Sequence, residues 1–178
     1  EIYVTGPAGV LADFAEAFGE IDGILLLVAL GVVLLILLIV YRSPVLPVIV
    51  LMTSILALGA ASFVIYQLAA NDVITLNGQS QGILFILVIG ATTDYSLLLV
   101  ARFREELRRT EYQVDAMRAT LKGTLEAILA SGGTVILGVM TLILSELNSN
   151  RGLGPVAAVG IAFAMLAALT FLPALLVM

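Results

Sequence analysis

The sequence has no cysteine, no histidine, no tryptophan and few charged residues. Without cysteine, neither a disulfide nor a thiolate metal site can form within the chain. Without histidine, it lacks the commonest metal ligand and the side chain that most often carries protons near neutral pH. Charged residues make up only 12%, and the net charge of −5 argues against nucleic acid, which proteins contact through Lys and Arg.

Apolar residues dominate what is present, at 61% of the chain with a mean hydropathy of +1.17. A helix needs about 20 apolar residues to cross a hydrocarbon layer ~30 Å thick at ~1.5 Å per residue. Five runs are long enough, at about 21–41, 45–70, 82–101, 125–146 and 154–178. They predict an all-α fold, a polytopic transmembrane bundle of five spans.

The distribution of Lys and Arg predicts the orientation of these spans. With the N-terminus and the loops 71–81 and 147–153 outside, only Arg151 is external. The other basic residues are all internal: Arg42, Arg102, Arg104, Arg108, Arg109, Arg118 and Lys122. Because basic residues concentrate on the cytoplasmic side of membrane proteins, we expect this topology rather than its reverse.

The first 20 residues differ from the rest. They begin with Glu1, carry the turn signal Gly6-Pro7-Ala8-Gly9, and continue with a mixed polar and apolar pattern. We interpret residues 1–20 as the tail of an external domain with a lead-in helix, a disordered tag remnant being the alternative. The chain ends within an apolar run, and we read it as a piece of a larger protein.

Between the third and fourth spans, apolar residues recur at helical spacing with charged residues on the other sides. The apolar positions are Phe103, Leu107, Val114, Met117 and Leu121. This pattern predicts an amphipathic helix at 102–122 on the inner membrane surface, although a partner-docking helix would show the same pattern.

The last predicted span carries small residues at four-residue intervals, Gly160, Ala164 and Ala168. Small residues at this spacing let transmembrane helices approach closely. We therefore expect this stripe to pack against a neighbouring helix.

Asp94 interrupts the third span. Gln81 precedes it by ~20 Å of helix and Arg102 follows at ~12 Å, which places the carboxyl near the middle of the membrane. An ionised group there costs at least about 2.5 to 3.5 kcal/mol. A hydrogen bond between transmembrane helices contributes only about 0.6 kcal/mol to stability on average. A purely structural hydrogen bond therefore explains the position of Asp94 poorly.

A carboxyl that gains and loses a proton explains Asp94 better. Gly90 and Ala91 lie one turn away and leave room, and hydroxyls are supplied by Thr92, Thr93, Tyr95 and Ser96. The chain has no phosphate-binding loop of the form G-x-x-x-x-G-K-[ST], which excludes ATP as the energy source for this piece. A proton gradient remains usable through one carboxylate, with no cofactor beyond protons.

The run "GATTDYSLLLVARFREELRR", residues 90–109, resembles the fourth transmembrane segment of the MMPL (mycobacterial membrane protein large) transporters of the resistance-nodulation-division superfamily. The segments "VTGPAG", "YRSP", "ASGGTV" and "FLPALL" also resemble that family, so the likeness covers nearly the whole chain. It implies five spans of one half-transporter, preceded by the end of an external porter domain.

The resemblance also implies a function, which is proton-driven export of lipids or other hydrophobic molecules across the bacterial plasma membrane. It places the proton relay at Asp94 and Tyr95. Ser131 and Thr134 resemble polar positions on the family's next span, where they are either relay neighbours that face Asp94 or hydroxyls that serve packing. Gly90 and Thr93, beside Asp94 on its own helix, are the other relay neighbours that we expect. The second half of the transporter, with its own Asp-Tyr pair, is the implied partner. A transporter of this kind is not an enzyme.

Two other classes fit some of these features. An intramembrane aspartyl protease would carry a Gly-x-Gly-Asp pattern, but Thr92 and Thr93 precede Asp94 here. A non-transporting sensor or assembly domain, similar to the sterol-sensing blocks of eukaryotic relatives, would have no need of a titrating group.

Taken alone, the chain would expose Asp94 to lipid. Two copies could avoid this by pairing Asp94 with Tyr95 of the other copy, which predicts a homodimer through residues 83–101. The alternative is a monomer in which Asp94 bonds Ser131 or Thr134.

Overall fold

A computed structural model of the chain describes residues 24, 27–41, 44–74, 78–146 and 148–177. Most of the described residues are helical, and none of them forms a strand. The elements are α2 (Val45–Ala70), α3 (Gly78–Glu106), α4 (Gln113–Met140), the 3-10 helix η1 (Thr141–Leu144) and α5 (Asn148–Val177). A shorter apolar helix, Leu27–Tyr41, precedes them.

Four of these helical stretches are long and apolar enough to cross a membrane: Val45–Ala70, Ser80–Glu106, Gln113–Leu144 and Asn150–Val177. The prediction of an α-helical membrane bundle is therefore confirmed. The run predicted at 21–41 is described from Leu27 to Tyr41 and at Ile24, whereas the predicted external tail at 1–20 lies outside the described residues.

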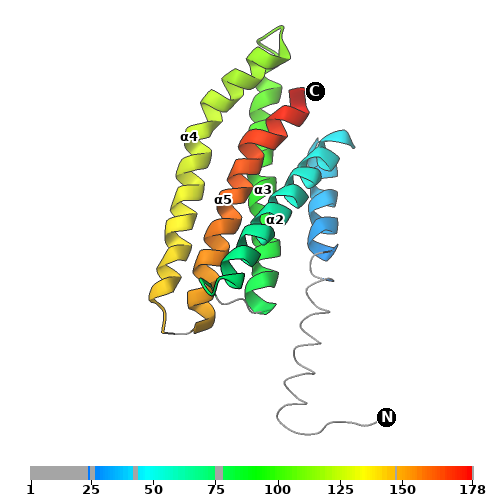
Figure 1. Cartoon of the computed structure of the whole chain (residues 1–178). Coiled ribbons are helices and arrows are strands. Elements are labelled where there is room, and N and C mark those ends of the chain that lie inside the picture. The colour runs from blue at the N-terminus through cyan, green and yellow to red at the C-terminus, as the bar shows by residue number, and fades with distance from the viewer. Residues whose placement is uncertain (1–23, 25–26, 42–43, 75–77, 147, 178) are drawn as a thin grey trace, which may run out of the picture.

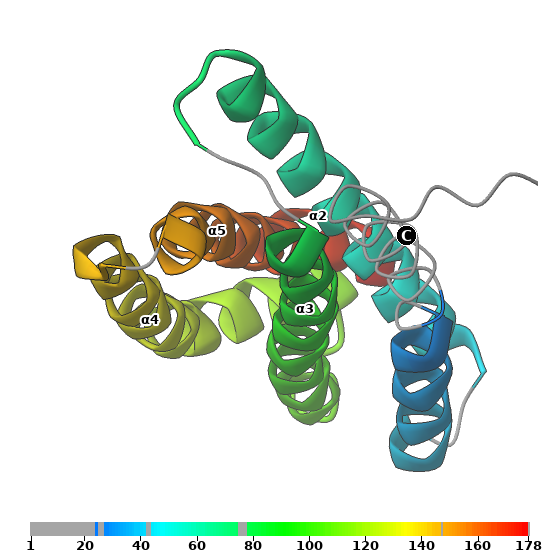
Figure 2. The same ribbon diagram turned by 90° about the horizontal axis from the view of Figure 1, so that it is seen from below.

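The bundle is organised around α5. This helix contacts α2, α3, α4 and η1, and the two views of the ribbon show the other helices grouped around it (Figures 1 and 2). The apolar part of α4 is only 11% buried, against 50% for that of α3. One wall of the bundle, formed by α4 and the adjoining side of α3, is therefore largely uncovered.

Small residues on α5 allow the helices to approach closely, as predicted. Gly160, Ala164 and Ala168 are all buried. A methyl group on Gly160 would lie 2.6 Å from the Leu84 side chain and 2.8 Å from that of Val88, both on α3. A methyl group at position 160 would therefore require these side chains or the two helices to shift, so the glycine permits the close approach of α3 and α5.

The prediction of a separate amphipathic helix at 102–122 was wrong. Instead, α3 continues to Glu106, residues 107–112 form a turn, and α4 begins at Gln113 (Figure 1). The end of α3 is tightened by a bond from the Arg109 amide to the Glu106 carbonyl at 2.9 Å. The Thr110 hydroxyl donates to the same carbonyl at 2.9 Å, which satisfies a group that a continuing helix would have bonded.

The apolar periodicity that suggested a surface helix serves packing between helices. Phe103 and Met117 are buried in one core cluster with Tyr41 of the first helix, and Leu121 packs against that cluster. Leu107 and Val114 remain exposed near the turn. Apolar residues at helical spacing can face either the membrane surface or a neighbouring helix. Here Phe103 and Met117 face neighbouring helices.

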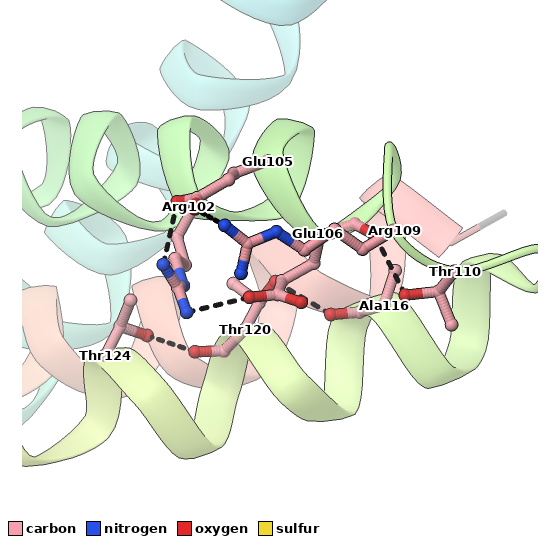
Figure 3. A network of polar contacts seen from close by, with 8 residues as sticks. All are labelled: Arg102, Glu105, Glu106, Arg109, Thr110, Ala116, Thr120 and Thr124. Atoms are coloured by element: carbon pink, nitrogen blue, oxygen red, sulfur yellow. Dashed lines mark hydrogen bonds and ion pairs between the residues drawn. The ribbon is translucent and has the colours of Figure 1, made fainter.

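A network of charged side chains lies at the end of α3 and in the turn after it (Figure 3). Arg102 pairs with Glu106 at 2.8 Å and with Glu105 at 2.7 Å, and Arg109 pairs with Glu105 at 2.7 Å. Glu106 is the buried member of this network. Arg104 points elsewhere, donating to the Tyr41 carbonyl at 3.2 Å with its guanidinium 5.3 Å from the Tyr41 ring centre, and so links the first helix to α3.

We predict that Gly160→Ala destabilises the bundle by about 1–3 kcal/mol, because the added methyl group would push α3 away from α5. Thermal unfolding in detergent micelles would measure the change. The matched control is Gly133→Ala on α4, where a methyl group would meet nothing within 4 Å. That control should unfold at the same temperature or higher, since alanine favours helix over glycine. Equal destabilisation by both variants would contradict the role given to Gly160.

Candidate functional site

Asp94 lies on α3, in a stretch from Gly78 to Ala101 that has no other charged residue. Its side chain is exposed at the wall of the bundle, whereas those of Thr92, Thr93, Tyr95 and Ser96 are buried. Consecutive residues of a helix are turned by about 100° from one another, so only one of them faces outward here. The helix thus presents the carboxyl to its surroundings and the neighbouring hydroxyl groups to the protein.

An open pocket of about 410 Å³ adjoins Asp94 between α3, α4 and α5. Its polar lining consists of Asp94 and Tyr95 from α3 and Ser131 from α4. The remaining lining residues are apolar or glycine: Ile86, Leu87, Gly90, Ala91, Val135 and Ile161. A cavity this large can hold several water molecules, because one occupies about 30 Å³ in the liquid. We call it the Asp94 pocket.

Tyr95 links Asp94 to α4. Its side chain forms a hydrogen bond with Ser131 and interacts electrostatically with Asp94. Only 8% of Tyr95 is exposed, and it packs in a core cluster with Ile128 of α4 and Ile161 of α5. The phenol is therefore held in place by three helices, while its polar end reaches the pocket.

The structure separates the four predicted relay neighbours into two groups. Gly90 and Ser131 line the Asp94 pocket. Thr93 donates to the Ile89 carbonyl at 2.7 Å, and Thr134 donates to the Ala130 carbonyl at 2.7 Å, so each is bonded within its own helix. Neither threonine lines the pocket.

Asp94 forms no hydrogen bond with another side chain among the residues the structure describes. The internal bonds from Asp94 to Ser131 or Thr134, which we expected of an isolated monomer, are not formed: Ser131 partners Tyr95, and Thr134 bonds back to its own helix. The carboxyl is therefore left available for water or for a partner outside the described part of the chain.

Two further hydroxyl groups on α3 stand out. Thr92 and Ser96 are fully buried, and neither hydroxyl oxygen has a hydrogen-bond partner in the described structure. They lie one turn apart and about 200° around the helix from Asp94, toward the bundle interior. Buried hydroxyls usually bond a partner, so this pair is the polar feature of α3 that sequence reasoning did not single out. The only signal for it was the run of hydroxyl residues around Asp94.

The chemistry that this arrangement allows is proton binding and release. A carboxyl and a phenol share one open pocket, and a hydroxyl from the next helix orients the phenol. Within the described ranges, no three His, Cys, Asp or Glu side chains come together as a metal site would require.

The sequence pattern of the MMPL family matches residues 1–178. SCO0839, a Streptomyces coelicolor protein whose name describes it only as a membrane protein, is 53% identical over 175 residues. The apo-petrobactin exporter of Bacillus anthracis is 34% identical over 175 residues, and the Mycobacterium tuberculosis transport protein MmpL2 is 34% identical over 174 residues.

Each alignment covers 98% of this chain. The chain in turn spans 25%, 24% and 18% of the lengths of these three relatives. It therefore corresponds to one part of each of these relatives. The match over all 178 residues shows that this chain belongs to the MMPL family.

Proposed function

We propose that this chain is the transmembrane part of a proton-driven exporter of lipids or other hydrophobic molecules. The observation that carries the proposal is the Asp94 pocket, where a lone carboxyl in an apolar helix lies beside a phenol at an uncovered wall. Ionisable groups within membrane spans mark proton and ion pathways, because their cost is otherwise unbalanced. Asp94 and Tyr95 form the relay pair, and protons serve as the coupling ion.

Two relatives support transport by their names, one being an exporter and the other a transport protein. Because the chain spans a quarter or less of these proteins, the rest of the parent would supply the porter domains and the second transmembrane half. The uncovered wall of α3 and α4 is where we place that second half. Its own acid and phenol would then meet Asp94 and Tyr95.

We also propose that the bundle lies in the bacterial plasma membrane with the α3–α4 turn inside. The charged network of Arg102, Glu105, Glu106 and Arg109 lies at that end, and basic residues favour the cytoplasmic side. The opposite end carries the α2–α3 and α4–α5 connections, which would face outward.

Replacing Asp94 with asparagine in the full-length parent should abolish export, because the amide keeps the shape of the carboxyl but cannot carry a proton. Efflux of a preloaded hydrophobic dye, such as Nile red, from energised cells would measure export. Protein abundance in the membrane should be unchanged. The matched control is Thr134→Ala, which lies outside the pocket and should export normally. Normal efflux by the Asp94→Asn variant would reject the relay and favour a sensor or assembly domain.

The orientation can be tested with single cysteines, since the chain has none of its own. Asn71→Cys, at an exposed position after α2, should react with an impermeant maleimide added outside intact cells. Arg108→Cys, in the exposed turn after α3, should react only after the inner side is opened to the reagent. The reverse pattern would show that the bundle is inserted the other way.

For the chain alone we propose a homodimer through the Asp94 side of α3, because Asp94 would otherwise face lipid at a cost of a few kcal/mol. Ala91→Cys and Leu98→Cys flank Asp94 and should form disulfide cross-links between copies in lipid bilayers. Leu137→Cys, on α4 and 72% exposed, is the control for random collision and should not cross-link. Absence of cross-links at positions 91 and 98 at high protein-to-lipid ratio would exclude this dimer.

A further inference from the structure

A second open pocket, of about 340 Å³, lies between α3 and α4 on the side of Asp94 nearer the α3–α4 turn. Its lining residues are Leu98, Ala101, Arg102, Glu105, Gly123, Thr124 and Ala127. We call it the Arg102 pocket. It carries the charged network at one end, and Figure 3 shows Arg102 reaching from α3 toward α4 beside Glu106.

The two pockets follow one another along the same pair of helices. On α3, Leu98 of the Arg102 pocket lies one turn after Asp94 of the Asp94 pocket. On α4, Ala127 lies one turn before Ser131 in the same way. Residues four apart share a helix face, so all four positions border one groove between the helices. The two positions on each helix are four residues apart, which corresponds to about 6 Å of helical rise.

Small residues leave open space along part of the groove. Ala101, Gly123 and Ala127 line the Arg102 pocket, and a methyl group added to Gly123 would come to 3.6 Å from Arg102 Nε. Gly90 opens the Asp94 pocket, since a methyl group there would meet nothing within 4 Å. Larger side chains at these positions would fill space that water can occupy.

From this placement we propose that the groove between α3 and α4 is the proton path between Asp94 and the inner surface. This inference rests on the proposed proton relay and adds its inner access route. The ion pair of Arg102 and Glu105 keeps water in the Arg102 pocket, while Asp94, Tyr95 and Ser131 hold water in the Asp94 pocket. Leu98 and Ala127 are the apolar residues between the two sets of polar groups, and we call this pair the apolar step. A proton can cross the apolar step when a short chain of water molecules enters it. Without water the apolar step blocks the proton.

The step positions offer a test that does not depend on transport. A cysteine thiolate reacts with a charged methanethiosulfonate only where water reaches it, so labelling maps wet positions. The test uses the full-length parent with any other cysteines replaced, in inside-out vesicles. The probe is the impermeant cation 2-(trimethylammonium)ethyl methanethiosulfonate. We expect Leu98→Cys and Ala127→Cys to be labelled from the inner side.

The matched controls are Leu129→Cys and Ala130→Cys, which are exposed on α4 at similar depth but line neither pocket. They should remain unlabelled because they would face lipid or apolar protein. No labelling at positions 98 and 127 would overturn the route. Equal labelling of the step positions and the controls would also overturn it, since water would then surround α4 rather than follow the groove.

A second experiment tests whether the groove is needed for export by the parent. Ala127→Phe should fill the step and reduce dye efflux by the parent, while Leu129→Phe should leave efflux at the parental level with equal protein abundance. Full efflux by Ala127→Phe would overturn the route even if Asp94→Asn is inactive, and the relay itself would stand. Conversely, normal efflux by Asp94→Asn together with labelling at position 127 would reject the relay and leave only a water-filled groove.

Discussion

The structure depends on one constraint, which is that a carboxyl group in the apolar part of a membrane helix must have a polar environment. Asp94 forms no hydrogen bond with another described side chain, and the polar groups beside it in the pocket are Tyr95 of its own helix and Ser131 of α4. Insertion of an ionised group without such an environment costs a few kcal/mol, comparable to a sizeable part of a protein's net stability. The open pocket and the uncovered wall of α4 are where this environment can be supplied.

The rotation of α3 that points Asp94 outward is fixed by helix packing. Gly160 brings α5 against Leu84 and Val88, and Ala164 and Ile161 pack with Tyr95. Because Tyr95 is held in this core, Asp94, the residue before it, must lie on the outer side of α3. The small residues of α5 thereby position the site without belonging to it.

Sequence reasoning succeeded where the information is local. Length and hydropathy located α2 at the bounds predicted. Which hydroxyl on α4 enters the pocket could not be predicted in that way. Ser131 and Thr134 are three residues apart on neighbouring parts of one helix face, and only the rotation of α4 against α3 decides that Ser131 meets Tyr95.

The same limit explains the error at 102–122. An apolar stripe with helical spacing reports that one face of a helix is covered, but it does not report whether lipid or protein covers it. Here Phe103 and Met117 belong to the core, so α3 and α4 extend as full helices beyond the apolar region. Because α3 extends in this way, Arg102 and Glu105 lie between the same two helices, α3 and α4, as Asp94 and Ser131 do. Had the segment turned away as a surface helix, the charged residues would not border the groove that begins at Asp94.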